Sequence, residues 1–189
     1  MNLPNLITSF RIIAAFVFLY FSALENWDLA FPVFFAAALT DLVDGSLARL
    51  LRQRTRLGAF LDPTADKLLM FFGFVTLTVS RYLPFFLTTL VIARDLFIVF
   101  GLRHLLRKKV TVVYQPTYLS KITTFLQIVT LSMALFLTQS SQNVIHFRES
   151  LHLLFDHFQV VIFLTASLTL ITGFQYWRIG RKLIRDLSY

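Results

Sequence analysis

The residues best suited to chemistry lie in the stretch DLVDGSLARLLRQRTRLGAFLDPTAD, at positions 41–66, where four carboxylates stand among basic residues. At 100° per residue, the first two aspartates share one face of a helix, and the last two, four residues apart, share one face of the next. Two antiparallel helices joined by the basic turn at 50–57 would bring all four together. The aspartates are Asp41, Asp44, Asp62 and Asp66.

Clustered carboxylates repel one another, so positive charge must lie among them, and Lys67 and Arg49 are too few to balance four anions. Hard divalent cations such as Mg²⁺ take carboxylate oxygens, and two of them can clamp a phosphoryl group between attacking and leaving oxygens. The alternative for any single aspartate is a helix cap or a salt-bridge partner. Gly45 and Gly58 fit both a ligand close to the backbone and simple helix packing, so they do not decide.

Six apolar windows supply the elements that position this cluster. Of the 189 residues, 57% are hydrophobic and 22 are Phe, and the mean hydropathy is +0.70. A window of about 20 apolar residues has the length of a membrane-crossing helix. We therefore expect an all-α, polytopic integral membrane protein with six transmembrane helices in a single domain, residues 1–189. The windows are 6–24, 29–48, 60–80, 83–103, 119–139 and 157–177.

The formal net charge of +8 is concentrated after the second, fourth and sixth windows. Because Lys and Arg favour the cytoplasmic side, we expect both termini and the aspartate cluster at the cytoplasmic face of a bacterial inner membrane or an equivalent organelle membrane. The basic residues flank apolar spans, so an anionic lipid bilayer is the expected partner rather than nucleic acid. The chain contains no Cys, which excludes disulfides, thiolate metal ligands and Cys nucleophiles.

The pattern Asp41-x2-Asp44-Gly45-x2-Ala48-Arg49-x8-Gly58-x3-Asp62-x3-Asp66 resembles the complete signature of the CDP-alcohol phosphotransferase family. The resemblance implies a six-helix membrane enzyme, commonly a homodimer, that displaces CMP from a CDP-linked lipid with the hydroxyl of an alcohol. It implies two Mg²⁺ or Mn²⁺ ions held by the four aspartates, and Asp66 as acceptor of the hydroxyl proton. The residues implied to shape and contact the CDP site are Gly45, Ala48, Arg49 and Gly58.

The similarity extends beyond the signature to two subgroups of the family. NLPNLITSFRI and DPTADKLL resemble both the phosphatidylglycerolphosphate synthases and the eukaryotic-type cardiolipin synthases. Gly101-Leu102-Arg103 resembles the first subgroup, whereas Arg94-Asp95 and PTYLSKITTFLQ resemble the second. Both subgroups use CDP-diacylglycerol. The family's commoner reaction favours glycerol 3-phosphate as acceptor, giving phosphatidylglycerol phosphate, and phosphatidylglycerol is the alternative acceptor.

A phosphorylated acceptor needs fixed cations near the metals, and the candidates are Arg94, Arg103 and Lys121. Arg94 lies inside an apolar window, where an unpaired guanidinium is costly. Its alternative role is a buried pair with Asp95 or with a motif aspartate. For Arg103 and Lys121 the alternative is an ordinary interfacial anchor.

Two further expectations concern helix ends near the motif. Asn5, Thr8 and Arg11 lie about one turn apart on the first expected helix, where they would either reach the cytidine side of the pocket or cap that helix. Pro63 is expected in the first turn of the helix that carries the second aspartate pair, where its missing N–H costs little.

Two other classes of function compete with the enzyme. Intramembrane carboxylates also suit a small cation transporter, but a path across the bilayer needs acidic groups at several depths, and these four gather at one side. A subunit that has lost activity is the third class. The intact motif argues against it, because loss of activity would free at least one aspartate to vary.

Overall fold

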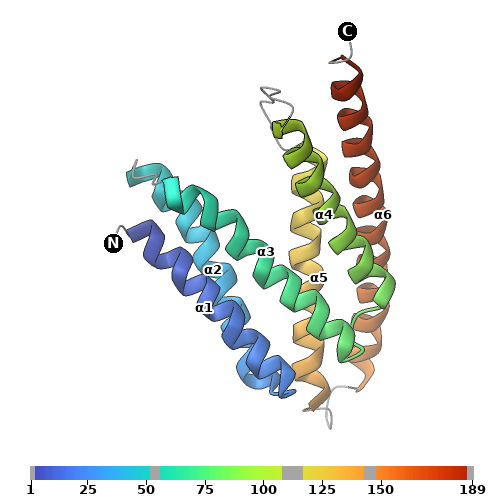
Figure 1. Cartoon of the computed structure of the whole chain (residues 1–189). Helices are drawn as coiled ribbons and strands as arrows, with labels where there is room; N and C mark the ends of the chain where they lie inside the picture. Colours follow the sequence, from blue (N-terminus) through green and yellow to red (C-terminus); the bar gives the residue numbers. More distant parts are fainter. Residues whose placement is uncertain (1–2, 52–55, 108–116, 143–147, 187–189) are drawn as a thin grey trace. The chain divides into compact units, whose positions relative to one another are not determined.

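The computed structural model describes residues 3–51, 56–107, 117–142 and 148–186. Side chains are described for residues 9–40, 67–101, 103, 117–138, 157–183 and 185. This described part consists of six α-helices and contains no strand, which confirms the all-α prediction. The helices in Figure 1 are α1 (Leu3–Ala23), α2 (Trp27–Leu51), α3 (Arg56–Val79), α4 (Phe85–Arg107), α5 (Tyr118–Gln142) and α6 (Arg148–Asp186).

Each predicted window corresponds to one helix, but the ends differ. Helix α3 begins at Arg56, which places Pro63 beyond its first turn, so that prediction is wrong. Helix α6 has 39 residues and extends past the window 157–177 at both ends. Within the described residues, Tyr118–Thr138 and His157–Leu183 have the length and composition needed to cross a membrane. Shorter apolar stretches lie on the first three helices, at Ser9–Ala23, Trp27–Thr40 and Lys67–Val79.

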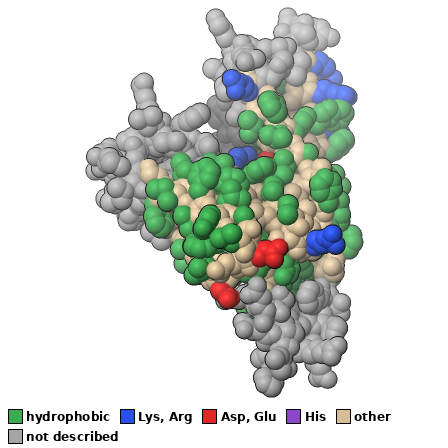
Figure 2. Space-filling view, turned by 60° about the horizontal axis from the view of Figure 1, so that its bottom comes forward, with side chains coloured by type: hydrophobic (Ala, Val, Ile, Leu, Met, Phe, Trp, Pro, Cys, Tyr) green, Lys and Arg blue, Asp and Glu red, His purple; other side chains and the backbone are tan. Residues whose placement is uncertain are grey.

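Many large apolar side chains lie on the surface. Phe16, Phe100, Phe125 and Phe163 are each more than half exposed. On the face shown in Figure 2, hydrophobic side chains cover much of the described surface. Soluble monomers rarely expose contiguous apolar patches beyond a few hundred Å², whereas lipid chains cover such a surface without penalty. A lipid environment therefore accounts for this distribution.

Residue contacts divide the chain into two compact units, and α5 contributes to both of them. In the first unit, α1 packs against α2 and against α3. Phe18 of α1 and Phe34 of α2 meet with ring centroids 5.5 Å apart. The first unit comprises Met1–Leu83 and Leu131–His146, and the second comprises Pro84–Thr130 and Phe147–Tyr189.

Helices α1 and α3 end in the same kind of turn. Glu25 and Arg81 adopt positive φ values of 55° and 64°. The next N–H in each turn donates to a carbonyl five residues earlier, from Asn26 to Phe21 at 2.9 Å and from Tyr82 to Leu77 at 2.8 Å. These bonds define Schellman motifs. Trp27 packs on Tyr82 with ring centroids 5.9 Å apart, so the two turns lie at the same end of the first unit.

The second unit has a polar seam of buried threonines between apolar side chains. Its residues are Thr123, Thr130, Thr165, Thr169 and Thr172. The hydroxyls of Thr130 on α5 and Thr165 on α6 lie 2.8 Å apart. Most of the buried threonines also donate to the carbonyl four residues earlier, as Thr169 does to Thr165 at 2.7 Å. Hydroxyl bonds of this kind let polar groups lie between membrane helices. Outside the seam, Phe86 of α4 stacks on Phe163 of α6 with ring centroids 6.4 Å apart.

Candidate active site

The two aspartate pairs lie on consecutive helices of the first unit. Helix α2 continues to Leu51 and so carries the first pair, while α3 begins at Arg56 and carries the second. The helical register expected for both pairs is therefore present in the backbone. Their side chains lie outside the described residues, as do those of the other motif positions. The positions concerned are Asp41, Asp44, Gly45, Ala48, Arg49, Gly58, Asp62 and Asp66.

Helix α1 brings a buried cation to the level of the first aspartate pair. Arg11 is 2% exposed. It lies 12 residues before the end of α1, and Asp41 lies 14 residues after the start of α2. At 1.5 Å per residue, both are about 20 Å along their helices from the connecting turn. Figure 1 shows the N-terminal end of α1 beside the end of α2 that leads into α3.

The place of Arg11 on α1 bears on one of the two roles expected for it, the helix cap, and its role in the pocket stays a prediction. It lies in the third turn of α1, so it does not cap that helix. A guanidinium this deeply buried needs carboxylate or carbonyl partners, and the first unit contains the four motif aspartates. Asn5 and Thr8 are on the same helix, but their side chains lie outside the described residues.

Arg94 is held by three neighbours in the second unit and is 8% exposed. Its Nη1 donates to Asp95 Oδ1 at 2.7 Å, and its Nη2 donates to Ser120 Oγ at 2.6 Å. The guanidinium carbon lies 5.9 Å from the ring centroid of Tyr176. The Nε group is buried and has no hydrogen-bond partner among the described residues. The pair with Asp95 that the sequence left open is thus present, and Nε is the guanidinium nitrogen that lacks a hydrogen-bond partner among the described residues.

The other two acceptor candidates differ in their relation to Arg94. Lys121 is exposed in the first turn of α5 and directly follows Ser120, which accepts a bond from Arg94. Arg103 is exposed on α4, nine residues after Arg94. Nine residues rotate the helix by about 180° beyond whole turns and advance it by about 13 Å. Arg103 therefore lies on the opposite face of α4 from Arg94, whereas Lys121 is next in sequence to a residue that Arg94 contacts.

Comparison with known proteins identifies the family. A model of the CDP-alcohol phosphatidyltransferase family matches residues 1–172, a range that includes every motif position and at least part of all six helices. The chain belongs to this family. Its members are associated with membranes, which agrees with the apolar surface and with the two helices long enough to cross a bilayer.

Relatives from both expected subgroups resemble the chain. The cardiolipin synthase (CMP-forming) of Homo sapiens is 32% identical over 203 residues, covering 99% of this chain and 64% of the relative. The CDP-diacylglycerol–glycerol-3-phosphate 3-phosphatidyltransferase of Rickettsia bellii is 34% identical over 184 residues, covering 96% of each. The Aquifex aeolicus protein of the same name is 36% identical over 127 residues, covering 66% of this chain and 70% of the relative. The chain thus spans less than two thirds of the human relative.

The sequence alone did not predict two of the side chains that contact Arg94, those of Ser120 and Tyr176. Ser120 lies in PTYLSKITTFLQ, which indicates only a resemblance to the second subgroup. Tyr176 lies near the end of the last apolar window. Nearby, Thr117, which immediately precedes α5, donates from Oγ1 to Gln175 Oε1 of α6 at 3.4 Å. A buried Arg in an apolar window was the signal that polar neighbours had to exist, but their identity depends on tertiary packing.

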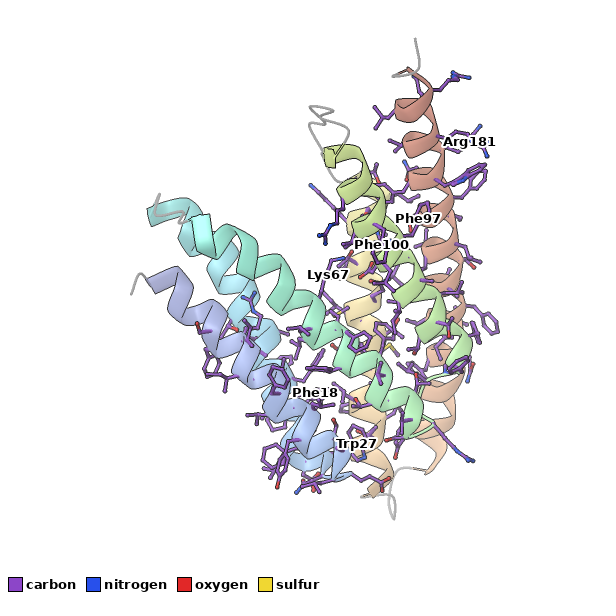
Figure 3. The ribbon with its side chains drawn as sticks, in the orientation of Figure 1. Phe18, Trp27, Lys67, Phe97, Phe100 and Arg181 are labelled. Atoms are coloured by element: carbon purple, nitrogen blue, oxygen red, sulfur yellow. The ribbon has the colours of Figure 1, made fainter. Side chains whose placement is uncertain are left out.

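The donor set of the family motif suits hard divalent cations. Four carboxylates on two consecutive helices supply the oxygen ligands that Mg²⁺ and Mn²⁺ take. Among the residues with described side chains, no group of three Asp, Glu or His gathers that could hold a metal. The basic side chain of Lys67, which directly follows Asp66, is exposed on α3 (Figure 3). The chemistry of the motif carboxylates therefore fits a divalent cation.

Proposed function

We propose that this protein transfers the phosphatidyl group of CDP-diacylglycerol to an alcohol and releases CMP. The observation that carries the proposal is the complete aspartate motif on two consecutive helices, in a chain that the family model matches over residues 1–172. The names of the relatives in both subgroups support the same reaction class.

In the proposed reaction the alcohol oxygen bonds to the phosphorus that carries diacylglycerol. The bond between that phosphorus and the bridging diphosphate oxygen breaks, and its electron pair leaves with CMP. Asp66 accepts the proton of the attacking hydroxyl. Bound Mg²⁺ or Mn²⁺, two per site, would neutralise the diphosphate and stabilise the attacking and leaving oxygens. The proposed metal ligands are Asp41, Asp44, Asp62 and Asp66.

The remaining motif residues bind and orient the CDP group. Arg49 bonds the diphosphate, because a guanidinium forms charge-assisted bonds to phosphate oxygens. Gly45, Ala48 and Gly58 have small or absent side chains, which lets the nucleotide approach the backbone. Arg11, buried at the level of Asp41, joins Asn5 and Thr8 on the cytidine side of the pocket.

Glycerol 3-phosphate is the proposed acceptor, and its product is phosphatidylglycerol phosphate. Arg94 and Lys121 supply positive charge in the second unit, and Arg94 has a buried Nε–H donor for phosphate. Arg103, on the opposite face of α4, takes the role of an interfacial anchor. Phosphatidylglycerol is the second candidate, favoured by the engagement of Arg94 with Asp95 and Ser120 and by the human relative.

The proposed setting is a membrane crossed six times, with both termini and the motif on the cytoplasmic face. Basic residues after the second, fourth and sixth helices support this orientation. The same residues make an anionic lipid bilayer the proposed partner, and we propose a homodimer as the assembled form. Nucleic acid is not among the proposed partners.

The test uses purified protein in detergent with CDP-diacylglycerol and Mg²⁺, and follows CMP release with each acceptor in turn. We expect release with glycerol 3-phosphate and a product with the mass of phosphatidylglycerol phosphate. EDTA should abolish release, and added Mg²⁺ should restore it. Release only with phosphatidylglycerol would establish the second candidate instead.

The Asp66→Asn variant tests the mechanism. Asparagine keeps the size of the side chain but cannot accept the hydroxyl proton as a carboxylate does. We expect CMP release to fall by at least about 100-fold, the range of general-base catalysis, with helical content by circular dichroism unchanged. Turnover at the parental rate would contradict the role of Asp66. Divalent-cation flux through vesicles in the absence of CDP-lipid would instead support a transporter.

A further inference from the structure

The C-terminal part of α6 has an exposed face that changes from apolar to basic along the helix. Counted at 100° per residue, six of its side chains fall within about 80° of arc. Three of them are large and apolar, and three are Arg. We name this face the α6 stripe; its residues are Phe163, Leu170, Phe174, Arg178, Arg181 and Arg185, all exposed.

Aromatic rings contact two guanidinium groups at the C-terminal end of the α6 stripe. Phe174 stacks on Trp177 with ring centroids 5.4 Å apart. The guanidinium carbon of Arg181 lies 3.8 Å from the ring centroid of Trp177, and that of Arg178 lies 5.6 Å from the ring centroid of Phe174. Stacking occupies the flat face of a guanidinium, whereas its N–H donors lie at the edge, where they bond phosphate bidentately. The rings thus present two phosphate-binding groups in a fixed place.

The length of α6 sets the depth of these groups. The apolar segment His157–Leu183 has 27 residues and is about 40 Å long at 1.5 Å per residue. The hydrocarbon core of a bilayer is about 30 Å thick, so the last turns of α6 reach the headgroup region. Trp and Arg are the residues that proteins place at that level. Figure 3 shows Arg181 near the C-terminal end of the helix.

We propose that the α6 stripe binds one anionic phospholipid of the surrounding bilayer. Its acyl chains lie along Phe163, Leu170 and Phe174, and its phosphate accepts hydrogen bonds from Arg178 and Arg181. Lys182 directly follows Arg181, is exposed, and adds positive charge. This site serves lipid recognition and does not depend on the proposed reaction.

Charge complementarity selects this occupant. Among the described side chains of α6, the stripe carries no acidic group to receive the ammonium of a zwitterionic headgroup. A second copy inserted in the same orientation and docked through the same face would be related by a two-fold axis along the membrane normal. Such an axis keeps equal depths together, so the basic ends of the two stripes would face each other. An anionic lipid satisfies both the apolar and the basic part of the stripe.

The experiment uses the two Trp of the chain. Trp27 is 2% exposed in the first unit, and Trp177 lies beside the α6 stripe, where it stacks on Phe174. The Trp27→Phe variant leaves Trp177 as the reporter, in phosphatidylcholine vesicles with a small, equal mole fraction of brominated-chain phosphatidylglycerol or brominated-chain phosphatidylcholine. Bromine quenches Trp only at short range. We expect phosphatidylglycerol to quench Trp177 several-fold more effectively than phosphatidylcholine.

Charge variants locate the effect. In the Trp27→Phe background, adding Arg178→Gln and Arg181→Gln should remove the difference between the two lipids, whereas Arg81→Gln, on the exposed α3–α4 turn, should leave it intact. Each quenching curve is normalised to the unquenched signal of the same variant. Equal quenching by both lipids in the parental background would overturn the proposal, since bulk lipid alone would then meet Trp177. Protection of Trp177 from both lipids would also overturn it, and would indicate that a second copy covers the face.

Discussion

Two arginines, Arg11 and Arg94, are almost fully buried in a chain whose surface is largely apolar. Arg11 belongs to the first unit and Arg94 to the second. Each takes a buried position that an aliphatic side chain would fill without the cost of burying a charge. A buried charge that has lost its partner costs several kcal/mol, so such residues are kept only where anions meet them. Substitutions of these two residues therefore test the proposed acceptor site and the proposed pocket.

The Arg94→Lys variant tests the acceptor site. Lys keeps the charge but cannot bond Asp95 and Ser120 through a planar fork while offering a further N–H. Loss of one charge-assisted hydrogen bond, worth about 1.5–3 kcal/mol, should raise KM for glycerol 3-phosphate by about 10- to 100-fold and leave KM for CDP-diacylglycerol unchanged. Initial rates with each substrate varied separately give both constants. Ser120→Ala, which keeps the Asp95 pair, is the control and should change KM less.

A different outcome would assign Arg94 a structural role. If Arg94→Lys lowered the thermal unfolding midpoint and changed the KM values of both substrates together, the Asp95 and Ser120 bonds would serve helix packing rather than the acceptor.

Arg11 gives a second prediction at this scale. Arg11→Leu removes a cation from the buried part of the first unit and leaves anions there without compensation, which costs about 3–5 kcal/mol. We expect a lower unfolding midpoint in detergent together with loss of CMP release. Arg11→Lys retains the charge and should keep more of both. An Arg11→Leu protein as stable and active as its parent would show that this guanidinium serves neither the fold nor the pocket.

At the scale of elements, the sequence predicted the six helices because apolar residues occur in runs of membrane-crossing length. It did not predict the length of α6, because Arg178, Arg181 and Arg185 end the apolar run while remaining helical. The positions of the aspartate pairs on α2 and α3 followed from spacing alone. The bond from Arg94 to Ser120, 26 residues away, did not, since it depends on how α4 packs on α5.

Gly73 on α3 provides a prediction about helix packing. A Cβ at this position would lie 3.2 Å from both Cδ atoms of Leu131, which is fully buried. At Gly101 on α4, a Cβ would meet nothing within 4 Å. Ala is favoured over Gly inside helices by about 1 kcal/mol, but overpacking a buried site costs about 1–3 kcal/mol. We therefore expect Gly101→Ala to raise the free energy of unfolding and Gly73→Ala to lower it.

The two glycine variants are compared by reversible unfolding in the same detergent, with helical content as the signal. Because the residue change is identical, the difference between them isolates the contact with Leu131. Equal stabilisation by both substitutions would mean that Leu131 moves aside without cost.

At the scale of the whole molecule, charge and turns together suggest an orientation. The α1–α2 and α3–α4 turns meet through Trp27 and Tyr82 at one end of the first unit, and the motif lies toward the other end of α2 and α3. Basic residues are concentrated after α2, after α4 and at the end of α6, whereas the α1–α2 turn carries Glu25 and Asp28. By the positive-inside rule, this distribution supports the proposed cytoplasmic location of the motif side.

This orientation can be measured directly, because the chain has no Cys and each introduced one is unique. Asn26→Cys lies on the exposed α1–α2 turn, and Ser188→Cys lies near the C-terminus. In intact cells, a membrane-impermeant maleimide should label Asn26→Cys and spare Ser188→Cys until the membrane is opened. Both sites labelled from the same side would contradict six spans, because the five helices between the two positions, if all of them cross, put Asn26 and Ser188 on opposite sides. Labelling of Ser188→Cys alone would keep the six spans and invert the protein, which would place the aspartates away from the cytoplasm.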